Sequence, residues 1–514
     1  MKPANQDRSR KSLDELHALC RRAEFSAAAE ALDDLLAKNA PAAEAAILRA
    51  RVALRQRKPA EALEIIARHA KSFSTDAELA NAALIAGAAY ARLGDERAAS
   101  AQFKRAATNV VKAPALRAAL AYERAAAAWI ARKLDVADRH LDELATLEPS
   151  ADALIEARVV RGAIAASREK LAEQGAILLD ALQQVHARPD PPVFYWAVIA
   201  SQIAYLAHEM RSPALRDAAF TELARIPWTP DLAEYRFTML RAVGWRYALE
   251  GDYFNAFRHL KEARAVAPSD GWRVTSSCDR AYFATVLGER RWAEQELSDA
   301  HELAVTVPWT SLDGEERFAL SVLAELYAPR DSALALSYVA KYKDAGSRFA
   351  RTLASSDDRR VLAMESYSFG VVQKALGEKE EAVRLLREAW EIYDRIGYDW
   401  RAGRAALQLA DATGDDSWKE RAAEKLRGYE RSWLRAERPS NILRVPPEAA
   451  ALTPARRGVY ELILRGLTTA QIAAEQGRSE FTVRNHVKAI FKAFGVTSRP
   501  ALIARAIGTA VSAD

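Results

Sequence analysis

The first 430 residues repeat one pattern of apolar and polar positions: an alanine-rich amphipathic helix, a short turn and a second amphipathic helix. The clearest copies are residues 240–267 and 367–393. In each copy a glycine followed by an acidic residue marks the turn, at Gly251 and at Gly377, and an alanine follows in the second helix. Glycine ends helices readily because it adopts the left-handed conformation without steric cost. The pattern therefore predicts a chain of helical hairpins.

Weaker copies of this hairpin fill the rest of the region. Their turns lie at Gly94-Asp95, Gly288-Glu289 and Gly414-Asp415, with degenerate turns near Lys58-Pro59, Lys133, Glu169, Arg211-Ser212 and Pro329. The unit resembles the tetratricopeptide repeat, whose period is about 34 residues. The resemblance covers residues 12–425 as roughly ten or eleven helix pairs. It implies an all-α superhelix, because each pair can bury its apolar stripe only against its neighbours.

The pattern changes near both ends of the chain. Residues 1–11 carry no apolar periodicity, and we expect them to be disordered. The helical repeats, or solenoid, are assigned to residues 12–434. Residues 435–451 are expected to form a linker, because their three prolines prevent a continuous helix. Residues 452–514 are assigned to a separate, small domain.

Aromatic residues gather in the middle third of the solenoid. They are Phe194, Tyr195, Trp196, Tyr205, Trp228, Tyr235, Trp245, Tyr247, Tyr253, Phe254, Trp272, Tyr282, Trp292 and Trp309. One interpretation is that they pack between helices, as buried aromatic rings usually do. The other is that a few of them line a groove for a protein or small-molecule effector. The sequence favours packing for any single ring and does not identify an effector site.

Four short helices are predicted in the C-terminal domain. They begin after Thr453, Thr468, Ser479 and Ser498 and end near Gly466, Gln476, Phe494 and Ala510. Serine and threonine are good N-cap residues, and Gln471 completes a capping box with Thr468. Gly477 is expected to make the turn between the second and third helices. The third helix is the longest of the first three, and its cap precedes an acidic residue that suits the positive helix end.

The third helix separates into two faces. The apolar face, expected to join the core, consists of Val483, Val487, Ile490, Phe491 and Phe494. The opposite face consists of Phe481, Arg484, Asn485, Lys488 and Lys492, without an acidic residue. Arginine can bond guanine O6 and N7, asparagine can bond adenine N6 and N7, and lysine reaches bases or phosphates. Three short helices in this order, with a basic third helix, indicate a helix-turn-helix DNA-binding domain.

Net charge supports this interpretation. The chain carries 74 basic and 69 acidic residues, a formal charge of +5. Residues 453–514 contain nine basic and four acidic residues, so 65 of each sign remain in the rest of the chain. The whole excess of positive charge therefore lies in the part that is expected to meet a polyanion.

The segment LTPARRGVYELILRGLTTAQIAAEQGRSEFTVRNHVKAIFKAFGVTSRPAL resembles the LuxR/FixJ-type helix-turn-helix domain along about fifty residues. The resemblance implies that the third helix enters the major groove of double-stranded DNA, with base contacts from Arg484, Asn485 and Lys488. It implies backbone contacts from Thr468, Thr469, Thr482, Lys492 and Arg499. It assigns His486 to bracing the third helix rather than to a metal. It also implies a homodimer contact through the fourth helix, near Ile503 or Ile507.

Three residues depart from the family pattern. Arg456 stands where a glutamate usually closes the first capping box, and arginine cannot accept those backbone bonds. Gln476 and Arg478 stand where the family has leucine and isoleucine in the turn. The pair would loosen the turn, or Arg478 would reach outward to a phosphate. These changes put DNA affinity and stability in question rather than the fold.

The sequence offers no catalytic constellation. It contains no G-x-x-x-x-G-K-[ST] phosphate loop and no G-x-S-x-G nucleophile motif, and its histidines are scattered singly. We therefore expect no enzyme activity, no cofactor and no metal. The N-terminus lacks the apolar region of a secretory signal, and no stretch is apolar enough to span a membrane. These features predict a cytoplasmic protein that associates with the bacterial nucleoid.

The leading hypothesis is a sequence-specific transcription regulator whose solenoid acts as a sensor or as a partner-binding scaffold. RNA polymerase is a further candidate partner. The alternative is a repeat-based interaction protein whose helix-turn-helix tail binds DNA weakly or has lost binding, through the changes at Arg456, Gln476 and Arg478. A third hypothesis, a mode of the first, is a regulator gated by a small molecule that binds among the aromatic residues.

Overall fold

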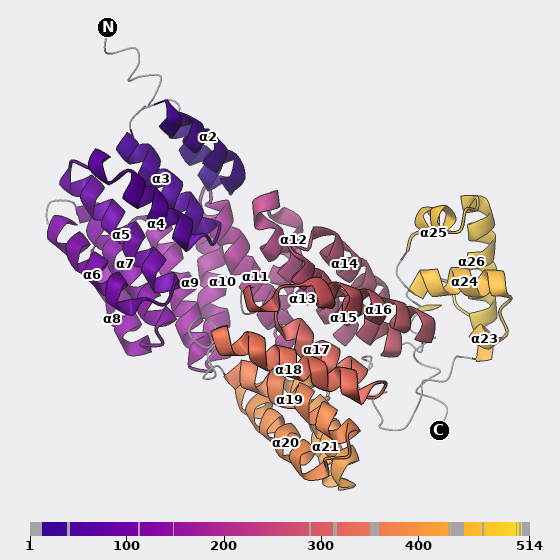
Figure 1. Cartoon of the computed structure of the whole chain (residues 1–514). Coiled ribbons are helices and arrows are strands. Elements are labelled where there is room, and N and C mark those ends of the chain that lie inside the picture. The colour runs from indigo at the N-terminus through magenta and orange to yellow at the C-terminus, as the bar shows by residue number, and fades with distance from the viewer. Residues whose placement is uncertain are drawn as a thin grey trace. The chain divides into compact units, whose positions relative to one another are not determined.

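The computed structural model describes residues 13–38, 42–110, 114–147, 149–286, 289–311, 316–349, 359–429, 432, 447–464, 467–499, 501, 502 and 505. Within these ranges the regular structure is helical and contains no strand, as the sequence predicts (Figure 1). The segment expected to be disordered, residues 1–11, lies outside the described residues. So does most of the expected linker, although its end forms the short helix α23 (Pro447–Ala450). The domain boundaries remain predictions.

Two compact units divide the chain. Unit 1 comprises residues 1–203, 221–235 and 351–353, and unit 2 comprises residues 204–220, 236–350 and 354–514. After a helix at residues 13–21, the first helices are α2 (Phe25–Ala37), α3 (Ala42–Arg55), α4 (Pro59–Arg68), α5 (Asp76–Arg92), α6 (Glu96–Asn109), α7 (Pro114–Ile130), α8 (Leu134–Ala145), α9 (Ala151–Ser167), α10 (Leu171–His186), α11 (Val193–Glu209) and α12 (Pro213–Arg225). They are followed by α13 (Ala233–Leu249), α14 (Tyr253–Val266), α15 (Asp270–Val286), α16 (Arg290–Thr306), α17 (Phe318–Tyr327), α18 (Ser332–Phe349), α19 (Arg359–Ala375), α20 (Lys379–Ile396), α21 (Asp399–Thr413) and α22 (Ser417–Lys425).

Successive helices pair as hairpins, as predicted. The pairs include α3 with α4, α5 with α6, α7 with α8, α9 with α10, α15 with α16, α17 with α18, α19 with α20 and α21 with α22. Gly288, expected at a further turn, lies outside the described residues. The other four glycines expected at the turns have left-handed backbone angles, with φ of 79° at Gly94, 81° at Gly251, 83° at Gly377 and 72° at Gly414. At the first three, the next residue donates its N–H to a carbonyl five residues earlier, for instance Asp252 to Tyr247 at 2.9 Å. This bond closes the first helix of each of these pairs.

Three of the five degenerate turns keep the same geometry without glycine. Arg57, Arg132 and Glu169 have φ of 59°, 59° and 63°. The residue after each of them again donates to the carbonyl five positions back, as Lys133 does to Ala128 at 2.8 Å. A left-handed residue with a Cβ costs about 1 kcal/mol or more. The turns without glycine are therefore strained copies of the turns with it.

A second regularity, which the sequence analysis missed, lies inside the hairpins. A glycine in the first helix faces a large apolar residue that lies sixteen positions later in the second helix. The pairs are Gly87 with Phe103, Gly162 with Leu178, Gly244 with Leu260 and Gly370 with Leu386. A Cβ added at Gly370 would lie only 2.8 Å from Leu386 Cγ. The glycines therefore set how closely the two helices of a hairpin approach.

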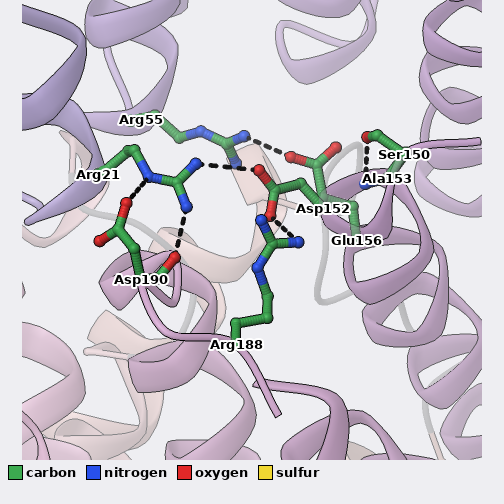
Figure 2. Close-up of polar contacts among 8 residues, drawn as sticks. All are labelled: Arg21, Arg55, Ser150, Asp152, Ala153, Glu156, Arg188 and Asp190. Atoms are coloured by element: carbon green, nitrogen blue, oxygen red, sulfur yellow. Dashed lines mark hydrogen bonds and ion pairs between the residues drawn. The ribbon is translucent and has the colours of Figure 1, made fainter. Parts of the chain in front are cut away.

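Ion pairs connect distant segments within unit 1 (Figure 2). Arg21 donates to Asp152 at 3.2 Å and also binds Asp190, and Arg188 forms an ion pair with Asp152 at 2.8 Å. Arg55 donates to Glu156 at 3.1 Å across 101 residues of sequence. Its guanidinium group also lies over the rings of Phe194 and Tyr195, at 4.9 and 4.5 Å from their centroids. Side chains thus join the first hairpins of the unit to its last ones.

A buried ion pair has the same role within unit 2. Glu209 at the end of α11 is fully buried and accepts two-pronged hydrogen bonds from Arg401 in α21, at 2.6–2.9 Å. His208 Nε2 lies 3.0 Å from the same carboxylate. Arg401 lies over the ring of Trp400, which stacks on Trp245 with a centroid distance of 5.7 Å. Burial raises the pKa of Glu209, but the charges and hydrogen bonds of Arg401 and His208 outweigh burial and hold it at about 2.

The turn geometry gives a first prediction. Replacing Arg132 by glycine removes the strain of its left-handed backbone, whereas replacing it by alanine keeps the Cβ and the strain. Both variants lose the same hydrogen bond to Ser167. The glycine variant should therefore be more stable than the alanine variant by about 1 kcal/mol. Urea unfolding of the full chain measures the difference, and equal midpoints would contradict the strain argument.

The buried pair gives a second prediction. Because the pKa of folded Glu209 lies below its unfolded value, the stabilisation is complete above about pH 4.5 and is lost as pH falls toward 2. Arg401→Met leaves the buried carboxylate without its guanidinium partner and should cost about 3–5 kcal/mol at pH 7. Glu209→Gln should flatten the acid dependence of the melting temperature in this window.

The double variant Glu209→Gln/Arg401→Met is the control for this pair. It removes both charges, so it should lose less stability than the sum of the two single variants. Additive losses would show that the two side chains do not stabilise each other.

Candidate nucleic-acid interface

Three described helices build the C-terminal domain: α24 (Pro454–Leu464), α25 (Thr469–Glu475) and α26 (Glu480–Phe494). Each packs against the other two. Their buried residues are Val459, Tyr460, Leu462, Ile463, Leu464, Leu467, Ile472, Ala473, Val483, Ile490 and Phe494. The ring of Tyr460 stacks on that of Phe494 with a centroid distance of 5.2 Å. The predicted apolar face of α26 is confirmed, with Val487 and Phe491 partly buried at its edge.

The predicted caps are also present. Thr468 and Gln471 form a complete capping box at the start of α25. The Ser479 hydroxyl accepts the Thr482 N–H at 3.2 Å at the start of α26. Gly477, with φ of 60°, makes the turn between the two helices. These local bonds fix the direction in which α26 leaves the turn.

The candidate base-contacting residues share the solvent-facing side of α26. Arg484, Asn485 and Lys488 are all exposed, as is Lys492, which was assigned to the DNA backbone. Arg484 Nη2 donates to Glu480 Oε2 at 3.0 Å, one helical turn earlier. Such an exposed pair contributes little stability, so the guanidinium group can exchange this partner for a base edge at small cost.

The other backbone candidates already make bonds within the domain. The hydroxyl groups of Thr468 and Thr482 take part in the two caps. The Arg499 guanidinium group binds the Leu467 carbonyl and donates to the Thr469 hydroxyl at 2.8 Å, and burial lowers its pKa. Arg499 therefore ties the fourth helix to the start of α25. Whether these four residues also meet phosphates stays a prediction.

The unusual turn residues have two different environments. Arg478 Nη1 donates to His486 Nε2 at 3.0 Å, so this arginine joins the turn to α26, a bond that the sequence did not reveal. Burial and the neighbouring Arg478 and Arg456 lower the pKa of His486, which suits its role as a neutral acceptor. Gln476 is half-buried, and its Oε1 is buried without a hydrogen-bond partner. A Cβ added at Gly458 in α24 would lie 2.9 Å from its Nε2.

The first and fourth helices are capped as expected where they are described. The Thr453 hydroxyl accepts the N–H of Arg456 at 3.4 Å, and the Ser498 hydroxyl accepts the N–H of Ala501 at 3.3 Å. Leu502 is fully buried. The residues proposed for a dimer contact, Ile503 and Ile507, lie outside the described residues, as does Gly466.

The aromatic residues of the solenoid mostly pack between helices. Trp196, Trp245, Trp272, Trp292 and Trp309 are buried. Several indole N–H groups find partners inside the protein: Trp196 donates to Glu222, Trp292 to Glu296 at 3.1 Å and Trp309 to the Ala304 carbonyl at 2.8 Å. The packing interpretation is confirmed for these rings.

Both cysteines are free, with Cys278 buried, and no group of three or more potential metal ligands occurs among the residues described. Likewise, none of the described helices is long and apolar enough to cross a membrane.

Gln476 gives a third prediction. A buried acceptor without a partner costs about 1–3 kcal/mol, so Gln476→Leu should stabilise the domain by about 1 kcal/mol. Native-state hydrogen exchange in residues 467–499 should slow by about fivefold. Ala474→Leu adds the same side chain at an exposed position of α25 and should leave exchange unchanged. Faster exchange in Gln476→Leu than in the wild type would show that the side-chain amide of Gln476 makes stabilising hydrogen bonds.

Comparison with known proteins adds the following. Residues 450–506 match the family described as bacterial regulatory proteins, luxR family. Curated protein sequences gave no match. The solved structure titled "Crystal structure of APC/C hetero-tetramer Cut9-Hcn1" is similar at 11% identity and a TM-score of 0.29, covering 96% of this chain and 95% of that one. "Structure of Naa15/Naa10 bound to HypK-THB" is similar at 16% identity and a TM-score of 0.19, covering 94% of this chain and 76% of that one.

The family match implies DNA binding and transcription regulation, in a family whose members are typically not enzymes. It covers the helices α24, α25 and α26 with their caps and core. The C-terminal domain of this chain is a LuxR-family helix-turn-helix domain, and it follows a tetratricopeptide-like series of helical hairpins.

Proposed function

We propose that the protein is a sequence-specific transcription regulator in which α26 enters the major groove of double-stranded DNA. The observation that carries the proposal is the separation of α26 into a buried apolar face and an exposed face with Arg484, Asn485, Lys488 and Lys492. The caps and the turn hold this helix on the domain surface. Arginine, asparagine and lysine supply donors that match the acceptors on guanine and adenine edges.

In this proposal Arg484, Asn485 and Lys488 contact bases. Lys492, one turn further along the helix, contacts a phosphate together with the hydroxyl groups of Thr468, Thr469 and Thr482. Arg499 acts chiefly through Thr469, because its guanidinium group binds that hydroxyl. Arg499 holds the start of α25, where a backbone phosphate would approach. It therefore affects DNA binding by positioning α25. The family's dimer contact through the fourth helix remains part of the proposal.

The solenoid serves as a sensor or as a scaffold for a partner. Stacked helical hairpins present neighbouring helices as one extended surface, which suits a peptide or protein partner better than a small molecule. One observation favours a macromolecular partner. Most of the aromatic rings are packed between helices, so few remain to line a pocket for a small molecule. RNA polymerase and a separate effector protein are both compatible with such a surface.

A second candidate function is an interaction protein whose tail binds DNA weakly. The buried, unpaired Oε1 of Gln476 favours it, because a destabilised turn lowers the population of the domain that is competent to bind. The two candidates differ in one measurable property, which is sequence-selective affinity for DNA.

The fourth prediction tests this property. The full chain should select a defined duplex from a random library in a mobility-shift assay. Arg484→Ala/Lys488→Ala should weaken binding to that duplex by about 10²-fold, because each base contact contributes about 1–3 kcal/mol. It should also reduce the dependence of affinity on salt concentration.

The matched control is Arg290→Ala/Lys419→Ala, which removes the same charge from exposed positions of the solenoid. It should leave binding unchanged. Equal losses in the two double variants would show that only net charge matters. If the wild-type chain selects no duplex at all, the interaction-protein function replaces the regulator.

A further inference from the structure

One apolar side chain on the DNA-facing side of α26 has no role in the fold. Phe481 is 73% exposed, more than any other large apolar residue described. The others that are exposed, Leu93, Val305 and Leu336, lie in the solenoid and far apart in sequence. Single exposed apolar residues are common on protein surfaces. Phe481 differs because of the residues around it.

Phe481 lies at the centre of the candidate base-reading face. At 100° per residue, Arg484, Asn485 and Lys488 fall within about 60° of it on either side. Along the helix axis, Arg484 lies about 4.5 Å and Lys488 about 10.5 Å beyond Phe481. These distances correspond to about one and three base-pair steps of 3.4 Å. A helix that places the three polar residues at base edges therefore brings the phenyl ring into the same groove.

The position of Phe481 in the helix supports this placement. It is the second residue of α26, two positions after the Ser479 cap. Recognition helices of helix-turn-helix domains contact base edges mainly with their N-terminal residues. Because a phenyl ring can neither donate nor accept a hydrogen bond, it cannot satisfy the polar edges of guanine, adenine or cytosine. The apolar group that the major groove offers is the C5-methyl group of thymine.

We propose that Phe481 contacts the C5-methyl group of a thymine in the target half-site and so sets a preference for thymine next to the base that Arg484 contacts. This inference rests on the proposed function and adds a base identity to it. The ring contacts a nucleobase methyl group rather than a protein surface, because the residues that flank Phe481 on this face are basic and polar. Apolar contact of this kind is worth about fourfold in affinity per methyl group.

The test uses the full chain and a duplex selected from a random library. Each thymine of the half-site is replaced in turn by deoxyuridine, which lacks only the C5-methyl group. For the wild type, one replacement should weaken binding by about three- to fivefold. Phe481→Ala should bind the thymine and deoxyuridine duplexes equally, whereas Phe481→Leu should keep most of the difference. A thymine outside the half-site is the DNA control.

The outcomes separate this inference from the proposed function. If the chain selects a duplex but no half-site deoxyuridine weakens binding, the methyl contact is wrong while the regulator stands. The same conclusion follows if Phe481→Ala keeps the wild-type ratio between the two duplexes. If Arg484→Ala/Lys488→Ala binds the selected duplex as tightly as the wild type does, the groove assignment fails, and the inference fails with it.

Discussion

The close approach of the two helices in each hairpin is the constraint on which the solenoid depends. Glycine in the first helix lets a leucine or phenylalanine of the second helix lie almost against its backbone, as Leu386 does at Gly370. This contact explains the alanine-rich composition, because a larger residue would separate the helices and leave voids that cost stability. A hairpin packed in this way still exposes one apolar stripe. Stacking on the next hairpin buries this stripe, so a series of hairpins follows from the geometry of a single hairpin.

Stacking alone does not determine how segments far apart in the sequence meet. Within each unit, charged side chains make the contacts between these distant segments specific. The Arg21 and Arg188 pairs with Asp152 do so in unit 1, and the Arg401 pair with Glu209 does so in unit 2. Buried ion pairs add little net stability, because desolvation offsets much of the attraction. Replacing Arg401 leaves the buried Glu209 carboxylate without this partner, so the pair selects one arrangement among many similar helix packings.

The sequence predicted those features whose causes are local. A glycine at the end of a helix, a serine or threonine before it, and an apolar stripe along it act within a few residues, so the hairpin turns and the caps of the C-terminal domain could be located. Pairs such as Glu209 with Arg401 could not, because 192 residues separate them and no local pattern marks either one. The left-handed backbone at Arg132 was also hidden, since nothing about arginine indicates it. The sixteen-residue spacing inside the hairpins is present in the sequence, but the periodicity of a single helix does not indicate it.

In the candidate site, the sequence located the exposed face of α26 because helical periodicity alone separates it from the core. It could not show which of the polar residues were already engaged. Arg499 binds Thr469 within the domain, and Arg478 binds His486, and both contacts depend on the folded turn. Because its guanidinium group is engaged in these bonds, Arg499 positions α25 and is less available to bind a phosphate.

The departures from the family pattern therefore differ in their consequences. Arg478 replaces an apolar contact in the turn by a bond to His486 and still connects the turn to α26. Gln476 leaves an unpaired buried oxygen and affects the stability of the turn. Neither residue lies among the exposed side chains of α26, so neither changes which bases that face can contact. In the proposed function, the substitutions act on how much of the domain is folded, while Arg484, Asn485 and Lys488 determine what the folded domain binds. Under this proposal, affinity and specificity are set by separate parts of the same sixty residues.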